Sequence, residues 1–481
     1  MPDRSPDYII IAVYLISIAL FGIITGGKQK SIKDYFLGSS NVPWWVVCFS
    51  IVAAETSTLT FISIPGLAYL TNLNFLQLTF GFLLGRIIIA LFFLPAYFRG
   101  ELKTAYTFLE HRFGNKTRSF ASVVFLFTRT AADGVRLFAT AIPLYLLLDI
   151  EPFIAILIIA LVSLIYTYTG GLKGVIWADA VQMFIYLGGA VIAGIYIINY
   201  LPEGFDSVIL SAGTENKFSL INLNFAGSFK TFFSEPYTLL SGLIGGAFLS
   251  MASHGTDQLI VQRLLATGDV SNSRKAVIGS GVIVIIQFSV FLMLGVLLYA
   301  FYGKLDIKSD EIFPMFIIKQ LPVGVSGIII AGLFAAAMST IAGSISSLSS
   351  STMHDLYIPL LGKFKNEKTL LIVSRIFTVI WTIMLILSAL FFMNSSRAVV
   401  ELALSIASFT YGGLLGTFIL GIVNRKANQK IALIAFSAGI IGMIIVVITD
   451  LTAWTWYTLI GVSITLTIGY FLTFIQKFEN N

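Results

Sequence analysis

The chain has 481 residues, of which 57% are hydrophobic and 11% charged, and its mean hydropathy is +0.91. Soluble domains carry about 25% charged and about 45–50% apolar residues, so this composition predicts a membrane protein and excludes a soluble enzyme. The net charge of +6 does not indicate nucleic-acid binding, because the Lys and Arg residues lie in short loops between apolar runs. One cysteine, Cys48, excludes an internal disulfide framework and a Cys-rich metal site.

Long apolar runs organise the whole chain. A helix that spans a bilayer needs about 20 mostly apolar residues, and on this basis we predict thirteen spans. They are 8–25, 44–70, 74–98, 119–149, 151–169, 174–200, 236–256, 276–302, 323–353, 369–394, 399–423, 430–449 and 453–475. We expect the first to be a retained helix, since no small-residue cleavage site follows it. No segment is long or polar enough for a separate soluble domain, so we expect residues 1–481 to form one transmembrane domain.

The loop charges predict an orientation. With the N-terminus outside, the inside loops hold nineteen Lys and Arg residues and the outside loops hold seven. Because positive loop charges favour the cytoplasmic side, we predict the N-terminus outside and the C-terminus in the cytoplasm. An odd number of spans agrees with termini on opposite sides.

The second run is interrupted by polar residues and by a Pro-Gly pair. Residues 53–66 read AAETSTLTFISIPG, which places Glu55 and the hydroxyl residues at 56–58 and 60 inside otherwise apolar sequence. Polar interruptions are costly in lipid and therefore mark functional sites. The composition favours an unwound helix whose freed carbonyls line a cavity and coordinate a cation. A kinked helix whose hydroxyls bond back to its own carbonyls is the structural alternative.

The ninth run carries small and hydroxyl residues at three- and four-residue spacing along one face. They are Gly332, Ala336, Ser339, Thr340, Gly343, Ser347 and Ser350. Small residues let another helix approach closely, and hydroxyls offer hard oxygen ligands to a small cation. A packing seam without an ion is the alternative. Because the second run is interrupted as well, carbonyls from one helix and hydroxyls from the other favour a sodium site made of five oxygens.

Ionisable residues also occur inside spans. Arg129, Asp133 and Arg136 share one helical face of the fourth run, where they form a structural ion pair or meet a polar substrate. Asp179 either supports the ion site electrostatically or hydrogen-bonds a neighbouring helix. We interpret His254, near the cytoplasmic end of the seventh run, as an ordinary polar helix-end residue.

Five segments together resemble the sodium/solute symporter family, which includes sodium-coupled glucose, proline, sialic acid and monocarboxylate transporters. The segments are AETSTLTFISIPG at 54–66, YTYTGGLKGVIWADAVQ at 166–182, GTDQLIVQR at 255–263, GLFAAAMSTIAGSISSLSS at 332–350 and SFTYGGLLGTFILGIVNRKAN at 408–428. The resemblance covers about residues 8–475. It implies an all-α, LeuT-like fold with two inverted repeats of five helices and broken helices. On this chain the repeats are 44–200 and 236–423, with an extra N-terminal helix at 8–25 and two C-terminal helices at 430–475.

The resemblance also implies a sodium site. Carried over residue by residue, its ligands are the carbonyls of Ala53, Thr56 and Ala336 and the hydroxyls of Ser339 and Thr340. Asp179 matches the aspartate that lies beside this site in the family. Some sialic acid transporters of the family have a second sodium site built from further serines. The matching positions here are Ala342 and Gly343, which have no hydroxyl, so we predict one sodium per cycle.

The resemblance does not extend to the solute-binding residues. The arginine that holds the carboxylate in sialic acid transporters aligns with Ala132, and Arg136 lies about one turn further along. The asparagine and tyrosine of the sugar transporters correspond to Ser250 and Ser253. The residues that we expect to face the solute are Ser57, Thr60, Phe75, Thr79, Asp133, Arg136, Ser250, Ser253 and Thr410. One base and one acid among them suit a small carboxylate, an amino acid or a sugar acid.

We therefore predict a secondary active symporter that imports a small polar solute with sodium by alternating access, in a bacterial inner membrane. A proton-coupled transporter that uses Glu55, Asp133 or Asp179 is the mechanistic alternative. A solute sensor that transports nothing is the alternative from another class. It normally needs a cytoplasmic output domain, and only about six residues follow the last predicted span. We expect no enzyme activity, no nucleic-acid partner and no obligate protein partner.

Overall fold

The computed structural model describes residues 4–100, 102–223, 229–362, 366–393, 399–449 and 451–479. Every regular element in these ranges is a helix. This follows from the apolar runs, because inside a bilayer the backbone N–H and C=O groups have to bond within the helix itself. The all-α fold expected from the sequence is therefore present.

The N-terminal half contains the first broken segment, between α3 and α4. In chain order the helices of this half are α1 (Ser5–Gly26), α2 (Ile32–Leu37), η1 (Gly38–Ser40), α3 (Trp44–Glu55), α4 (Thr58–Leu70), α5 (Leu76–Ile88), η2 (Ile89–Phe93), α6 (Leu94–Arg99), α7 (Thr107–Phe113), α8 (Asn115–Leu148), α9 (Pro152–Tyr200) and α10 (Phe205–Thr214).

The C-terminal half contains the serine-rich α16. The helices of this half are α11 (Phe229–Ser234), η3 (Ser241–Gly245), α12 (Gly246–Gly255), α13 (Gln258–Leu265), α14 (Val270–Tyr302), α15 (Ser309–Lys319), α16 (Val325–Ser351), η4 (Thr352–Gly362), α17 (Glu367–Phe392), α18 (Val399–Val423), α19 (Gln429–Ile448), η5 (Trp454–Trp456) and α20 (Tyr457–Glu479).

The number of membrane spans differs between the sequence pattern and the described helices. Among the described residues, eight helices are long and apolar enough to cross a membrane, or nine if the bent pair Ile32–Ser40 and Trp44–Glu55 is one span. The predicted spans 151–169 and 174–200 both lie in α9, which is interrupted where Gly171 takes φ 58°. Glycine adopts this left-handed conformation without steric cost. The number thirteen stays a prediction.

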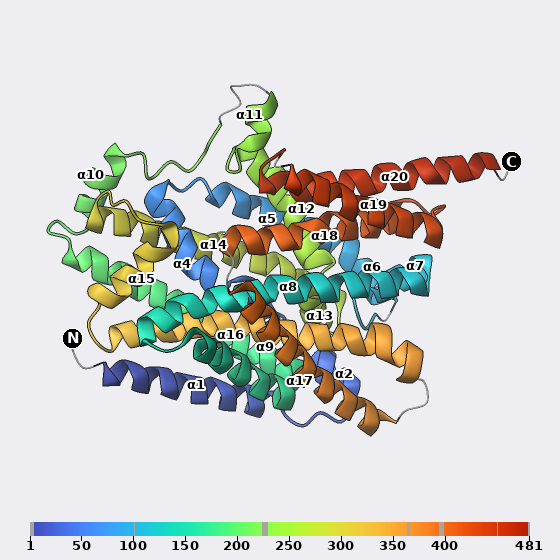
Figure 1. Ribbon diagram of the computed structural model, residues 1–481, viewed down its shortest axis with the longest axis horizontal. Coiled ribbons are helices and arrows are strands. Elements are labelled where there is room, and N and C mark those ends of the chain that lie inside the picture. Colours follow the sequence, from blue (N-terminus) through green and yellow to red (C-terminus); the bar gives the residue numbers. More distant parts are fainter. Residues whose placement is uncertain are drawn as a thin grey trace.

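Helix α16 forms the centre of the molecule. Nearly all of its residues are buried, and it packs against α9, α1, α8, α3 and α4. Figure 1 shows α1 along one side of the molecule and α18, α19 and α20 together along the opposite side. The start of α1 and the end of α20 lie at opposite ends of the long axis (Figure 1). The residues of the two predicted ion-binding segments are therefore enclosed by other helices.

The N-terminal helix is attached to this centre by specific contacts. Oδ1 of Asp7 accepts hydrogen bonds from the backbone N–H groups of Gly324 (2.7 Å) and Gly327 (3.0 Å), and Oδ2 accepts one from the Ser326 hydroxyl (2.7 Å). These groups belong to the start of α16, whose first N–H groups have no partner within the helix and carry partial positive charge. Helix α1 thereby supplies the anion that caps α16.

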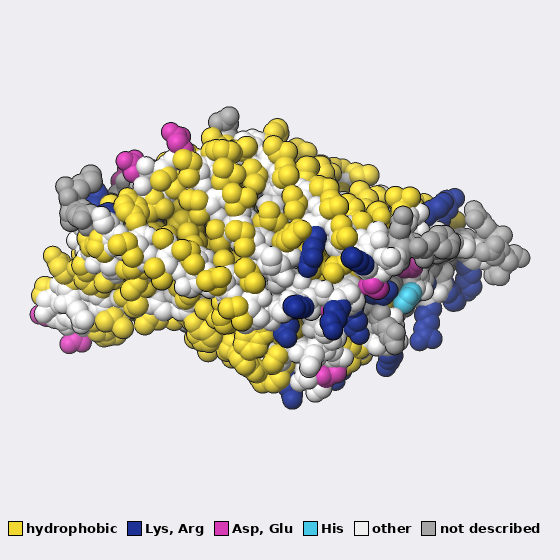
Figure 2. Space-filling view, turned by 90° about the horizontal axis from the view of Figure 1, so that it is seen from below, with side chains coloured by type: hydrophobic (Ala, Val, Ile, Leu, Met, Phe, Trp, Pro, Cys, Tyr) yellow, Lys and Arg dark blue, Asp and Glu magenta, His cyan; other side chains and the backbone are white. Residues whose placement is uncertain are grey.

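The surface suits a bilayer. Figure 2 shows a broad hydrophobic band across the middle of the molecule, with Lys and Arg side chains gathered toward one end. Exposed large apolar side chains on α1 and α17 belong to the apolar surface, among them Ile9, Ile24, Ile376 and Phe391. In water such a surface would be unfavourable, whereas lipid tails accommodate it.

Candidate functional site

The second predicted span is broken at the residues that the sequence indicated. Helix α3 ends at Glu55 and α4 begins at Thr58, while Thr56 (φ −88°, ψ 99°) and Ser57 (φ −85°, ψ 167°) are extended. The N–H of Thr56 still bonds to the carbonyl of Val52, and the Ser57 hydroxyl accepts the N–H of Thr60 at the start of α4. The later carbonyls of α3 therefore lack partners within their helix and are free to meet a cation.

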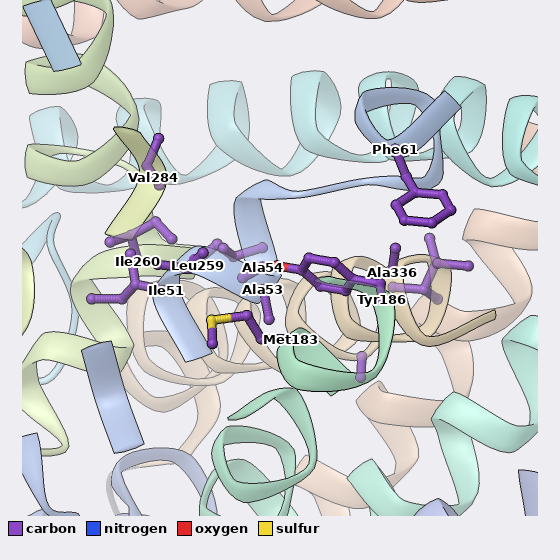
Figure 3. Packing of buried hydrophobic residues seen from close by; sticks show 14 of the residues in the cluster. Ile51, Ala53, Ala54, Phe61, Met183, Tyr186, Leu259, Ile260, Val284 and Ala336 are labelled. Carbon is purple, nitrogen blue, oxygen red and sulfur yellow. The ribbon is translucent and has the colours of Figure 1, made fainter. Parts of the chain in front are cut away.

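Helix α16 lies against this break. The Thr58 hydroxyl donates to the Leu333 carbonyl at 3.0 Å, which joins α4 to α16. One turn further along α16, Ala336, Ser339 and Thr340 are buried, and the Thr340 hydroxyl donates to the Ala336 carbonyl at 3.2 Å. Figure 3 shows Ala53 and Ala54 at the end of α3, with the ring of Tyr186 between them and Ala336 in this view. The predicted carbonyl and hydroxyl ligands thus come from two elements that are in direct contact.

Asp179 of α9 connects buried polar side chains of α3, α13 and α16. Its Oδ1 accepts the Ser339 hydroxyl (2.8 Å), and its Oδ2 accepts the Ser50 hydroxyl (2.7 Å) and Nη2 of Arg263 (2.9 Å). Nε of Arg263 also donates to Ser50 (2.9 Å). All four side chains are buried, so the network links α3, α9, α13 and α16. Because the Ser339 proton points to Asp179, its oxygen lone pairs remain available to a cation.

A second buried chain of hydrogen bonds holds Thr56, and no sequence pattern indicates it. Nε2 of Gln287 donates to the Thr56 hydroxyl at 2.7 Å, and the Tyr186 hydroxyl donates to Oε1 of Gln287 at 2.9 Å. Thr56 in turn donates to the Val52 carbonyl at 2.7 Å. The Thr56 side chain is therefore engaged, which leaves its carbonyl as the group that can bind an ion.

A cavity of about 420 Å³ begins at the break and extends to the starts of α15 and η5. Its wall contains apolar rings, hydroxyls and charged groups. The lining residues are Ala54, Glu55, Ser57, Leu59, Thr60, Ser63, Ile64, Leu67, Phe75, Leu78, Phe82, Arg129, Arg136, Tyr237, Leu249, Ser250, Ser253, His254, Asp257, Leu259, Ile260, Phe288, Ser309, Asp310, Tyr411 and Trp454. The ring of Phe75 stacks on Phe288 at 5.2 Å. A pocket with apolar walls and a few polar groups is typical of a small-molecule site.

The structure brings six of the nine predicted solute residues to this cavity: Ser57, Thr60, Phe75, Arg136, Ser250 and Ser253. The other three do not line it. Thr79 is buried and donates to the Leu76 carbonyl. Thr410 lines a separate pocket of about 20 Å³, a volume suited to a single water rather than an organic solute.

Asp133, the third of these residues, is fully buried between two arginines. Nε of Arg129 lies 2.6 Å from Oδ2 and Nη1 of Arg136 lies 3.1 Å from Oδ1, and the Ser344 hydroxyl donates to the same carboxylate. Arg129 also pairs with Asp257 at 2.9 Å. Of the two roles that the spacing left open for this face, Asp133 has the structural one. The guanidinium of Arg136 remains at the cavity wall.

A charged cluster of Glu55, Arg86 and His254 lies at the cavity. The sequence did not predict that these residues form one site. Nη2 of Arg86 and Nε2 of His254 lie 2.5 Å and 2.7 Å from the same oxygen of Glu55, Oε2. Nη1 of Arg86 donates to Ser280, and Nδ1 of His254 lies 2.8 Å from the Ser253 hydroxyl. His254 therefore contacts Glu55 and Ser253, which an ordinary polar helix-end residue would not need to do. The available signal was that all three groups lie within apolar runs, where ionisable residues are costly.

Comparison with known proteins identifies the family. The model of the "Sodium:solute symporter family" matches residues 35–442. The chain belongs to the sodium:solute symporter family. The resemblance seen in the sequence is thereby confirmed, and so is its consequence that the protein is a transporter and not an enzyme.

Two relatives of this symporter are sodium/sialic acid symporters. SiaT of Proteus mirabilis (strain HI4320) is 29% identical over 454 residues, which are 91% of this chain and 88% of the relative. NanT of Aliivibrio fischeri (strain ATCC 700601 / ES114) is 28% identical over 482 residues, which are 99% of this chain and 94% of the relative. A solved structure of a substrate-bound, outward-open Na⁺-coupled sialic acid symporter superposes with a TM-score of 0.89 at 26% identity and covers 98% of both chains.

These matches settle the general activity of the symporter. It is an integral membrane protein that couples the transport of a solute to sodium, and sodium is the cotransported ion, as the sequence predicted.

Proposed function

We propose that this symporter imports a small polar organic solute together with one sodium ion, by alternating access between two inverted repeats, 44–200 and 236–423. The N-terminus lies outside and the C-terminus in the cytoplasm, as the loop charges predict. The membrane is the bacterial inner membrane, a location that the two bacterial relatives support. The observation that carries this proposal is the hydrogen bond from Thr58, which directly follows the unwound Thr56–Ser57 segment, to Leu333 of α16, the helix that also carries Ser339 and Thr340.

The proposed sodium ligands are the carbonyls of Ala53, Thr56 and Ala336 and the hydroxyls of Ser339 and Thr340. Unwound backbone beside a helix is the arrangement that coordinates sodium in transporters of this architecture. Sodium at this position would bind α3 and α16 together. Bound sodium would hold the break in the shape that the cavity needs, so that sodium and solute favour each other reciprocally.

The position of Arg263 beside α16 also supports the proposal of a single sodium. At Gly343 a side chain would overlap the guanidinium of Arg263, which pairs with Asp179. The space beside Gly343 is thus taken by a fixed cation of the protein itself. A second sodium here would meet like charge without a hydroxyl to bind it, since Ala342 and Gly343 offer none.

Inward transport draws on the sodium gradient. Moving one elementary charge across the membrane potential contributes about 2.3 kcal/mol per 100 mV, and the concentration gradient adds to this. In the outward-facing state sodium and solute bind, and the solute cavity then closes. Low cytoplasmic sodium lets the ion leave first, which weakens solute binding by the same linkage. The proton-coupled alternative would use Glu55, Asp133 or Asp179, and it predicts transport that does not require sodium.

The test is sodium-dependent uptake by purified protein in proteoliposomes, with an inward gradient of sodium or of potassium. A panel of amino acids, hydroxy acids, sugar acids and sugars should contain a solute that accumulates only with sodium. Thr340→Ala should raise the sodium concentration for half-maximal uptake about tenfold, the effect of losing about 1.4 kcal/mol of binding. Thr340→Ser keeps the hydroxyl and should behave like wild type. Equal uptake in potassium, or equal behaviour of the two variants, would contradict the proposed site.

A further inference from the structure

Two buried polar atoms of cavity-lining residues have neither a hydrogen-bond partner nor an ion-pair partner among the described residues. They are Oε1 of Glu55 and Oγ of Ser250, and both residues line the cavity. Buried polar groups are nearly always hydrogen-bonded in proteins, so an orphan at a cavity indicates a partner that binds there. Glu55 and Ser250 are therefore candidates for contact with the transported solute.

Contacts to the other oxygen of Glu55, Oε2, hold the carboxylate in place. Arg86 and His254 both approach Oε2, and Ser280 accepts a hydrogen bond from Arg86 behind them. An ionised carboxylate only accepts hydrogen bonds, so the missing partner of Oε1 has to be a donor. Because the group is fixed by neighbours on two other helices, it is organised before a ligand arrives.

The cavity also has a cation with donors to spare. Arg136 makes one contact to another charged group of the described chain, from Nη1 to Asp133, and its side chain is 22% exposed. Its remaining N–H groups have no hydrogen-bond acceptor among the described residues, and the residue lines the cavity. Arg129 differs, because it is shared between Asp133 and Asp257. The planar fork of an arginine suits a carboxylate.

Oε1 of Glu55 needs a hydrogen-bond donor, whereas Arg136 needs an acceptor. A simple anion would pair with Arg136 and leave Oε1 of Glu55 without a donor, whereas a simple cation would satisfy Oε1 and leave Arg136 without an acceptor. Of the other acids of the wall, Asp257 pairs with Arg129 and accepts the Tyr411 hydroxyl, and Oδ1 of Asp310 accepts the hydroxyls of Ser63 and Ser309. We propose, on the basis of the proposed function, that the solute is a zwitterion, with its ammonium group at Glu55 and Ser250 and its carboxylate at Arg136.

Matched pairs of solutes test this on the wild-type protein. The probes are L-alanine with L-lactate, L-leucine with L-2-hydroxyisocaproate, and glucosaminate with gluconate, each titrated against thermal stability in sodium and in potassium. A ligand that binds only the folded state raises its stability. In at least one pair the amine should bind about 10- to 100-fold more tightly than the hydroxy acid in sodium, as a hydrogen bond to a charged group would give.

Each outcome decides between the two proposals. A hydroxy acid that binds as tightly as its amine partner overturns the zwitterion assignment, while sodium-dependent binding of either keeps the symport mechanism. Stabilisation by sodium alone, with no response to any of the six solutes, also overturns the zwitterion assignment and leaves the ion site standing. Absence of any difference between sodium and potassium overturns the proposed function instead.

The Glu55→Gln variant tests the residue directly. It should lower the preference for the amine within a pair about tenfold or more, whereas a general defect would weaken both members equally. Glu55→Asp keeps the charge beside Arg86 and should retain part of the preference, which covers the case that the glutamine variant does not fold. The matched control is Glu203→Gln, an exposed site outside the cavity. An unchanged preference in folded Glu55→Gln would contradict the assignment.

Discussion

The two polar regions of the protein are built differently. Around Asp179, every polar side chain that we have described has its partners: Ser50, Ser339 and Arg263 are linked to the same carboxylate. At and beside the cavity, Oε1 of Glu55, Oγ of Ser250 and Nε of Arg86 have no hydrogen-bond partner among the described residues.

The difference corresponds to what each region has to bind. A small ion needs oxygens that are already oriented, so the groups behind its ligands are bonded to each other and not to water. An organic solute brings its own donors and acceptors, and the groups that meet it stay unpaired until it arrives. We therefore expect changes near Asp179 to affect folding and the sodium response together, and changes at the cavity to affect mainly solute binding.

The largest effect is expected for Asp179→Ala. It removes the acceptor of two hydroxyls and leaves the buried guanidinium of Arg263 without its anion, which typically costs about 3–5 kcal/mol of stability. We expect a much lower melting temperature of the purified protein and no difference between sodium and potassium. A folded Asp179→Ala variant with a wild-type sodium response would show that the network does not support the ion site.

Ser339→Ala should have the next largest effect. It removes a hydrogen bond to a charged group, worth about 1.5–3 kcal/mol, and a predicted sodium ligand at the same time. Both the melting temperature and the apparent sodium affinity should fall, measured in one titration of thermal stability with sodium chloride. If the affinity for sodium stayed unchanged while stability fell, Ser339 would be a structural residue only.

Asp7→Ala extends the comparison to the start of α16. The carboxylate caps α16 from α1, and losing such a cap costs about 0.5–2 kcal/mol. We expect lower thermal stability and a weaker sodium response, because the predicted ligands lie further along the same helix. Asp7→Asn keeps an oxygen acceptor without the charge and should fall between Asp7→Ala and wild type. A sodium affinity equal to wild type in Asp7→Ala would limit this contact to a structural role.

Ser250→Ala should have the smallest effect on stability. Its hydroxyl makes no hydrogen bond within the described chain, so we expect a change within about 0.5 kcal/mol, in contrast to the same substitution at Ser339. The sodium response should remain, and the affinity for the transported solute should fall. A loss of stability as large as that of Ser339→Ala would remove the distinction between the two regions.

Single elements show how far sequence reasoning reaches. The break between α3 and α4 was predictable, because Glu55, several hydroxyls and a Pro-Gly pair cannot all continue an apolar span at low cost. The interruption of α9 was predictable as well, because Gly170 and Gly171 lie between the predicted spans 151–169 and 174–200. In the structure the two helical segments meet at a kink, where Gly171 has a positive φ.

What the sequence determined by itself is the membrane class, the position of the broken span, the hydroxyl face of α16 and, through shared motifs, the family. These properties depend on neighbouring residues and on periodicity, which a single chain displays. Only the tertiary structure decided that Ser344 of α16 donates to Asp133, that Arg263 reaches Asp179, and that Arg86 and His254 meet at Glu55. Those contacts join residues from distant helices. Which buried charge is satisfied and which is left for a ligand depends on that packing, not on any local pattern.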